Sequence, residues 1–144
     1  MTENTHISDA VSRHDVEGIT TRASSFPSYV RAGDYVFITG QVSIDDDGQV
    51  VAPGDVHAQT AQALSRLRRI TEAAGGGIDS IVTATCYLTK AEFALEFNAA
   101  WAATFGEHRP ARATVVAELL DPLLLVEVQA TAYIPVTGIS QLPS

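Results

Sequence analysis

The sequence predicts an α+β domain in which two helices cover one face of a mixed β-sheet. Residues 34–44 are rich in β-branched and aromatic side chains, and residues 55–74 carry apolar residues at helical spacing. Segments of both kinds then alternate to about residue 133. The expected order is strand, strand, helix, strand, helix, strand, strand. The other sheet face would stay uncovered, and we expect another copy of the chain to cover it in a homo-oligomer.

Length and charge restrict the class of protein. The chain has 144 residues, enough for one domain with one core, and a formal net charge of −8. An acidic chain without a basic stripe repels phosphate backbones, so we expect neither nucleic acid nor membrane as a partner. Residues 1–6 show no basic start or apolar segment, so we expect no secretory signal and a cytoplasmic location. The single cysteine excludes an internal disulfide.

The first half of the chain predicts a hairpin followed by a long helix. Residues 1–28 lack a sustained period, and we expect an extension with at most one short strand. The strand at residues 34–44 would turn at Asp45-Asp46-Asp47-Gly48 into a short return strand at residues 49–51. Asp55 can cap the helix, and the three glycines at 75–77 end it. Four polar side chains on this helix are expected to face solvent or a partner chain: Gln59, Gln62, Arg66 and Arg69.

The second half predicts a strand, a helix and a final hairpin. Residues 80–89 alternate as a strand does, and Thr89-Lys90-Ala91-Glu92 has the spacing of a capping box. A stripe of aromatic residues follows on one helical face: Phe93, Phe97, Trp101 and Phe105. Residues 113–119 and 123–133 then form two strands, joined by a turn at Asp121-Pro122.

Two opposite charges in the last two strands stand out. Arg112 follows Pro110 where a loop becomes a strand, and Glu127 lies between two valines in an apolar run. A half-buried carboxylate has either a partner or a function, and a structural ion pair and a binding site are equally compatible with the sequence. If the two strands form a hairpin, Val116 lies opposite Glu127 and Arg112 lies roughly 13 Å further along. This spacing favours two charges that bracket a small anionic molecule.

Other reactive residue types have simpler interpretations. Cys86 lies among apolar residues and is expected to be a small core side chain. His108, near Arg112, is a weak candidate for an acid or base. The four histidines show no ligand spacing, so we expect no metal site.

Several ordered segments resemble the RidA (YjgF-type) family of reactive intermediate deaminases over residues 29–134. The segments are Gly33-Asp34-Tyr35-Val36-Phe37-Ile38-Thr39-Gly40-Gln41, Asp47-Gly48, Gln59-Thr60, Glu72-Ala73-Ala74-Gly75, Tyr87-Leu88, Phe97-Asn98, Pro110-Ala111-Arg112 and Val126-Glu127-Val128. Each is short, but their order and spacing together are specific.

The resemblance implies a chorismate-mutase-like α+β fold, with a mixed six-stranded sheet and two helices packed on one face. It also implies a homotrimer with sites between subunits. The domain would span residues 29–135, between an extension at 1–28 and a tail at 136–144. The implied activity is hydrolysis of enamine and imine intermediates of the 2-aminoacrylate type to a 2-oxo acid and ammonia, with no cofactor and no metal.

The resemblance also suggests roles for individual residues. Arg112 matches the arginine that binds the substrate carboxylate, and Glu127 matches the glutamate that positions or activates water. Tyr29, Thr39, Asn98 and Thr114 occupy positions of the pocket wall. A glutamate between valines is expected to have a raised pKa, so Glu127 can also return a proton to the departing ammonia.

Four departures from the family pattern predict a divergent pocket. Phe26-Pro27-Ser28-Tyr29 replaces the usual Gly-Pro-Tyr, Arg66 replaces an asparagine, Gln129 a glutamate, and Thr114 a cysteine. We therefore expect a pathway-specific substrate, which need not be 2-aminoacrylate. The alternatives are a hydrolase or tautomerase acting on another small acid, and a non-catalytic trimer that binds metabolites or protects proteins. A ribonuclease is the least favoured interpretation because of the acidic charge.

Overall fold

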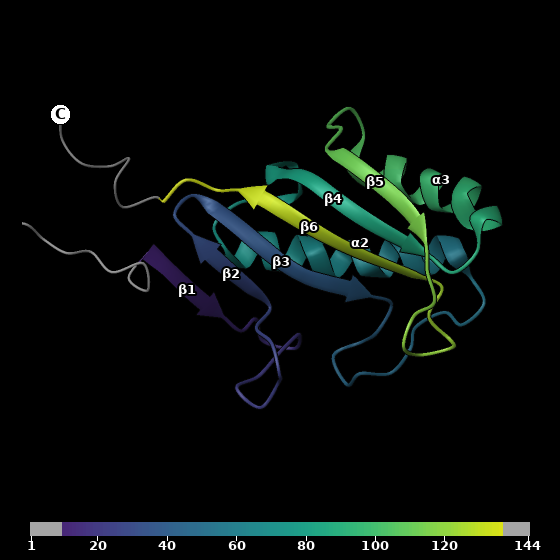
Figure 1. Cartoon of the computed structure of the whole chain (residues 1–144), viewed down its shortest axis with the longest axis horizontal. Coiled ribbons are helices and arrows are strands. Elements are labelled where there is room, and N and C mark those ends of the chain that lie inside the picture. Colours follow the sequence, from purple (N-terminus) through teal and green to yellow (C-terminus); the bar gives the residue numbers. More distant parts are fainter. Residues whose placement is uncertain (1–9, 137–144) are drawn as a thin grey trace, which may run out of the picture.

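The structure is a computed structural model that describes residues 10–136, in which a six-stranded sheet is covered on one face by two helices (Figure 1). The strands are β1 (Val11–His14), β2 (Tyr29–Ala32), β3 (Tyr35–Val42), β4 (Ile81–Leu88), β5 (Ala111–Val116) and β6 (Val126–Tyr133). The helices are α2 (Val56–Ala73) and α3 (Ala94–Phe105), with short 3-10 turns η1 (Ile78–Ser80) and η2 (Ala91–Phe93). The parts of the predicted extension and tail at residues 1–9 and 137–144 lie outside the described residues.

The sheet is mixed, with the strand order β1-β2-β3-β6-β4-β5. Only β4 and β5 are parallel; every other neighbouring pair is antiparallel. The last strand, β6, lies between β3 and β4, so it holds the two halves of the sheet together. The predicted α+β class, with six strands and two helices on one face, is confirmed.

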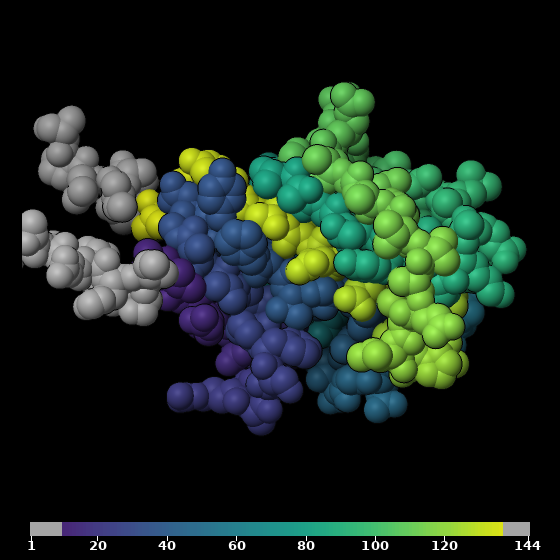
Figure 2. Space-filling model, in the orientation of Figure 1, coloured from purple at the N-terminus to yellow at the C-terminus, as the bar shows by residue number. Residues whose placement is uncertain are grey.

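Alternation along β6 separates the two faces of the sheet. Val126, Val128, Ala130 and Ala132 are buried in the core beneath the helices. The residues between them, including Glu127 and Gln129, lie on the opposite face. This second face is open, and Figure 2 shows strands β3 and β6 at the molecular surface there. Three aromatic residues on these strands are about half exposed: Tyr35, Phe37 and Tyr133.

The ends of α2 agree with the sequence prediction. The Asp55 carboxylate accepts a hydrogen bond from the backbone N–H of Ala58 at 2.9 Å, and this bond caps the helix. At the other end Gly75 adopts a φ of 98°, which favours glycine and stops the helix after Ala74. Within residues 10–136 no helix has both the length and the hydropathy needed to cross a membrane.

The start of α3 differs from the prediction. The capping box at Thr89-Lys90-Ala91-Glu92 does not form: the chain first makes the η2 turn, and neither η2 nor α3 has a side-chain cap. The aromatic stripe is nevertheless buried at Phe97, Trp101 and Phe105. Burial of this face holds the helix without a capping side chain.

The predicted final hairpin is wrong. β5 pairs with β4, and β6 also pairs with β4, so the segment between β5 and β6 carries the chain over β4. Val116 therefore lies opposite Leu88, and Glu127 lies opposite Tyr87. Alternation of apolar residues identifies a strand but not its neighbours. The predicted return strand at residues 49–51 is reduced to one bridge between Ile44 and Val50.

Two polar side chains of α2 that were expected to face solvent or a partner chain are buried. Gln59 donates to the carbonyl of Leu123 and accepts from the N–H of Leu125, both at 2.9 Å. Arg66 is only 2% exposed and also bonds backbone carbonyls. Helical spacing could not identify them as buried, because their partners are carbonyl and N–H groups of loops distant in sequence.

Candidate active site

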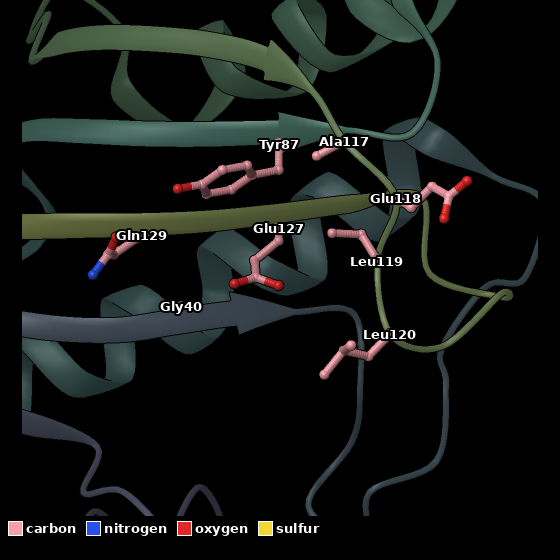
Figure 3. Close-up of a pocket in the computed structure, with 8 residues that line it drawn as sticks. All are labelled: Gly40, Tyr87, Ala117, Glu118, Leu119, Leu120, Glu127 and Gln129. Carbon is pink, nitrogen blue, oxygen red and sulfur yellow. The ribbon is translucent and has the colours of Figure 1, made fainter.

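Glu127 lies beside a cavity of about 420 Å³ on the open face of the sheet. Figure 3 shows its carboxylate directed towards Gly40 of β3, with Tyr87 on the other side of β6. The segment after β5 closes one side of the cavity. The lining residues are Gly40, Tyr87, Ala117, Glu118, Leu119, Leu120, Glu127 and Gln129.

The Glu127 carboxylate has no hydrogen-bond or salt-bridge partner in the part of the chain that the structure describes. Burial raises the pKa of Glu127 above its ordinary value, as the sequence predicts. Because no residue between 10 and 136 pairs with this carboxylate, the group is available to take up or release a proton at the cavity. This pattern differs from that of a structural ion pair.

Gly40 creates the space that the Glu127 carboxylate occupies. The register of β3 against β6 shifts between Ile38 and Gln41, which places an extra residue at this point in β3. A methyl group built on Gly40 would overlap a carboxylate oxygen of Glu127. The irregularity and the missing side chain together let the carboxylate lie against the β3 backbone.

Arg112 lies on β5, at the edge of the sheet. Its guanidinium stacks on Trp101 and Phe97, with its central carbon 5.0 and 5.3 Å from the ring centres. Nη2 donates to Oδ1 of Asn98 at 2.8 Å, the only hydrogen bond of this guanidinium within residues 10–136. Helix α3 therefore fixes the plane of the group, and its remaining N–H groups can bind an anion.

Arg112 and Glu127 lie on opposite sides of the sheet. Arg112 pairs with Ala84 of β4, whose side chain is buried beneath the helices. Glu127 pairs with Tyr87 and faces the open side. The structure thus brings Arg112 together with Asn98. Arg112 does not line the Glu127 cavity of the same chain.

The other predicted pocket residues also divide between separate places. Tyr29 belongs to the core, where it stacks on His14 at 4.6 Å and burial raises its pKa. The hydroxyl of Thr39 donates to the carbonyl of Pro27 at 2.6 Å. Thr114 lies two residues after Arg112 on β5. None of the three lines the Glu127 cavity.

His108 and Cys86 do not join the Glu127 cavity either. The His108 ring bonds the carbonyl of Ile81 at 2.7 Å, at the end of β4 remote from Tyr87. Cys86 is buried, and burial raises its pKa to about 12, so it is the core residue that the sequence predicts. Residues 10–136 contain no cluster of three or more side chains able to hold a metal ion.

Sequence reasoning assigned no role to Gly40. A glycine inside a strand signals an irregularity or a close approach, so Thr39-Gly40-Gln41 could have indicated where the carboxylate lies. The cavity wall at Leu119 and Leu120 had no comparable signal, because it depends on the course of the segment after β5.

A family model described as Endoribonuclease L-PSP matches residues 20–134, most of the chain. The chain belongs to the endoribonuclease L-PSP family. Its relatives within this family include a RutC family protein of Pyrococcus horikoshii, 36% identical over 104 residues. That match covers 72% of this chain and 82% of the relative.

Solved structures of similar proteins share the fold. The Rid family protein YyfA of Yersinia pestis has a TM-score of 0.80 and 26% identity, over 87% of this chain and all of that one. The YjgF gene product of E. coli has a TM-score of 0.76 and 28% identity, over 85% and 98% of the two chains. The predicted resemblance to the RidA and YjgF proteins is therefore confirmed.

Proposed function

We propose that this L-PSP family protein is a cofactor-free hydrolytic deaminase of enamine and imine intermediates. The observation that carries the proposal is the Glu127 carboxylate, which is half buried and unpaired within residues 10–136 and faces a cavity. Such a group can take a proton from water and return it to a departing amine. The relatives named Rid and YjgF give the proposal its family context.

The proposed reaction converts an imine and water into a 2-oxo acid and ammonia. An enamine such as 2-aminoacrylate first takes a proton from solvent at carbon and becomes the iminium ion. Water then attacks the iminium carbon, one water proton passes to Glu127, and the C=N double bond becomes a single bond to a neutral amino group. Glu127 returns that proton to the amino nitrogen, the C–N bond breaks to release ammonia, and the carbinol O–H proton passes to solvent as the carbonyl forms. Arg112 would hold the substrate carboxylate throughout.

The proposed active unit is a homotrimer with its sites at subunit boundaries. The opposite orientation of Arg112 and Glu127 in one chain supports this arrangement, because each site would take the arginine of one subunit and the glutamate of the next. The half-exposed aromatic residues on the open face give a surface for such contacts.

Release of pyruvate from enzymatically generated 2-aminoacrylate tests this proposal. We expect Arg112→Ala and Glu127→Gln each to lower the rate on the order of 10²-fold. Arg109→Ala and Glu72→Gln, at exposed positions outside the proposed site, are matched controls and should keep the parent rate. Variants at 112 and 127 as fast as the parent would overturn the mechanism, and a parent without acceleration would overturn 2-aminoacrylate as substrate.

Cleavage of RNA, which the family description names, is a second activity to measure. The Glu127 cavity has no lysine or arginine among its lining residues, and the chain has a net charge of −8. Both features disfavour binding of a phosphate backbone. We expect no RNA cleavage at any salt concentration; cleavage lost in Glu127→Gln would instead assign the site to RNA.

A further inference from the structure

A second cavity, of about 210 Å³, lies beside the end of β3 under the segment 19–26. Its wall is apolar at Ile19, Phe26, Val42 and Ile44. Arg66 is the only charged residue that lines it. Gly40 lines this cavity and also the Glu127 cavity, so the two are neighbours across one residue without a side chain.

Arg66 lines this cavity, and one nitrogen of its guanidinium has no hydrogen-bond partner within residues 10–136. Nε donates to Oε1 of Gln41 at 3.0 Å, and Nη1 donates to the carbonyls of Ile44 and Asp45 at 3.2 and 3.4 Å. Nη2 has no hydrogen-bond partner in the described part of the chain. Nη2 is not fully enclosed, and because the side chain is only 3% exposed, the cavity that Arg66 lines is the space open to a ligand of Nη2.

The charge of Arg66 is only partly balanced by nearby carboxylates. Asp46 lies 3.8 Å from Nη1 of Arg66, but its oxygens are bound by Arg69 at 2.7 and 3.3 Å. The Asp45 carboxylate accepts from two backbone N–H groups of its own turn. Burial and the neighbouring Arg69 lower the pKa of Arg66, while the two aspartates oppose the shift. An anion bound at Nη2 would stabilise the buried charge.

We infer that the Arg66 cavity is a subsite for the second carboxylate of a dicarboxylic substrate. This inference rests on the proposed function, and it adds the substrate class. A ligand with one carboxylate on Arg66 would pass Gly40 and bring its reactive carbon to Glu127. The apolar wall suits the methylene groups between the two ends. The first carboxylate would bind Arg112 of the neighbouring subunit.

Binding of two matched 2-oxo acids tests the subsite by calorimetry on the full chain. The probes are 2-oxoglutarate and 2-oxopentanoate, which differ in having a carboxylate or a methyl group at the far end. We expect the dicarboxylate to bind at least about tenfold more tightly, as for a charge-assisted hydrogen bond in a protected site. Arg66→Gln should abolish the difference without changing the binding of 2-oxopentanoate. Arg68→Gln, at an exposed position on α2 that does not line the cavity, should retain it.

A second variant distinguishes loss of binding in the cavity from loss of stability in the loop at Ile44 and Asp45, which Arg66 supports. Ser24→Phe places a ring at the cavity wall and leaves every hydrogen bond of Arg66 intact. It should reduce 2-oxoglutarate binding to the level of 2-oxopentanoate. Equal binding of both probes by the parent, no binding of either, or a difference that persists in Arg66→Gln would overturn the subsite. If the parent binds 2-oxoglutarate more tightly than 2-oxopentanoate through Arg66 but has no deaminase activity, the proposed reaction is wrong and the subsite stands.

Discussion

Gly40 is the residue on which the position of Glu127 depends most directly, because a side chain there would occupy the place of the carboxylate. We expect Gly40→Ala to lower the deamination rate on the order of 10²-fold, since small displacements of a catalytic group have effects of this size. Steady-state kinetics measures the loss. In a Glu127→Gln background Gly40→Ala should lower the rate little further, because the catalytic carboxylate that the methyl group would displace is already absent. Independent, multiplying losses would show that Gly40 acts through another group.

The raised pKa of Glu127 predicts how stability depends on pH. Between the unfolded and the higher folded pKa, the folded chain holds a proton that the unfolded chain releases. The free energy of unfolding therefore falls as pH rises through this window. Glu127→Gln should be more stable than the parent at pH 7, and the advantage should vanish at about pH 3, below the ordinary glutamate pKa of about 4.3.

Urea unfolding at both pH values and one protein concentration measures this difference. Asp79→Asn, at an exposed position in η1, is a control for the loss of one carboxylate. A Glu127→Gln variant less stable than the parent at neutral pH would reveal a stabilising partner of the carboxylate.

The burial and local conformation of a residue were predictable where they depend on the residues next to it in the sequence. The valines beside Glu127 predicted its burial and the direction of its pKa shift. The proline before Arg112 predicted the start of a strand, and β5 begins at Ala111. Arg66 was expected at the surface, because its partners, at Gln41, Ile44 and Asp45, come from another part of the chain.

At the scale of the element, α2 depends on its cap at Asp55. Asp55→Ala removes the acceptor for the N–H of Ala58 and should cost about 1 kcal/mol of stability. Asp55→Asn keeps an oxygen acceptor and should lose much less. Thermal or urea unfolding of the two variants compares them directly, and equal losses would show that the charge of Asp55 matters more than its hydrogen bond.

The positions of β3, β4, β5 and β6 were predicted to within a few residues, whereas β2 and the pairing of the last two strands were not. Both β5 and β6 have strand composition, and the turn residues between them favoured a hairpin. β6 instead inserts between β3 and β4, where both of its edges form hydrogen bonds and its apolar side faces the core. The pairing of β6 depends on all the strands of the sheet, so it cannot be predicted from the pattern of residues 111–133 alone.

At the scale of the whole molecule, the open face should determine assembly. Phe37 of β3 is about half exposed on this face, and Phe37→Glu would bury an unpaired charge at each subunit contact of the proposed homotrimer. We expect monomers in sedimentation experiments and loss of deaminase activity, because Arg112 and Glu127 would no longer face each other. Leu95→Glu, at an exposed position on α3, is the matched control. A Phe37→Glu trimer with full activity would exclude this face as the interface.

The central position of β6 has a consequence for synthesis on the ribosome. Until residues 126–133 have emerged, the nascent chain holds two separate pieces of sheet, β1-β2-β3 and β4-β5, with no strand to bridge them. The core between α2 and the sheet is therefore incomplete while most of the polypeptide is already outside the exit tunnel. Long-range pairing of this kind exposes apolar strands for a time that grows with the distance between partners. We therefore expect the speed at which residues 117–133 are translated, and chaperones that shield strand edges, to affect the yield of folded protein.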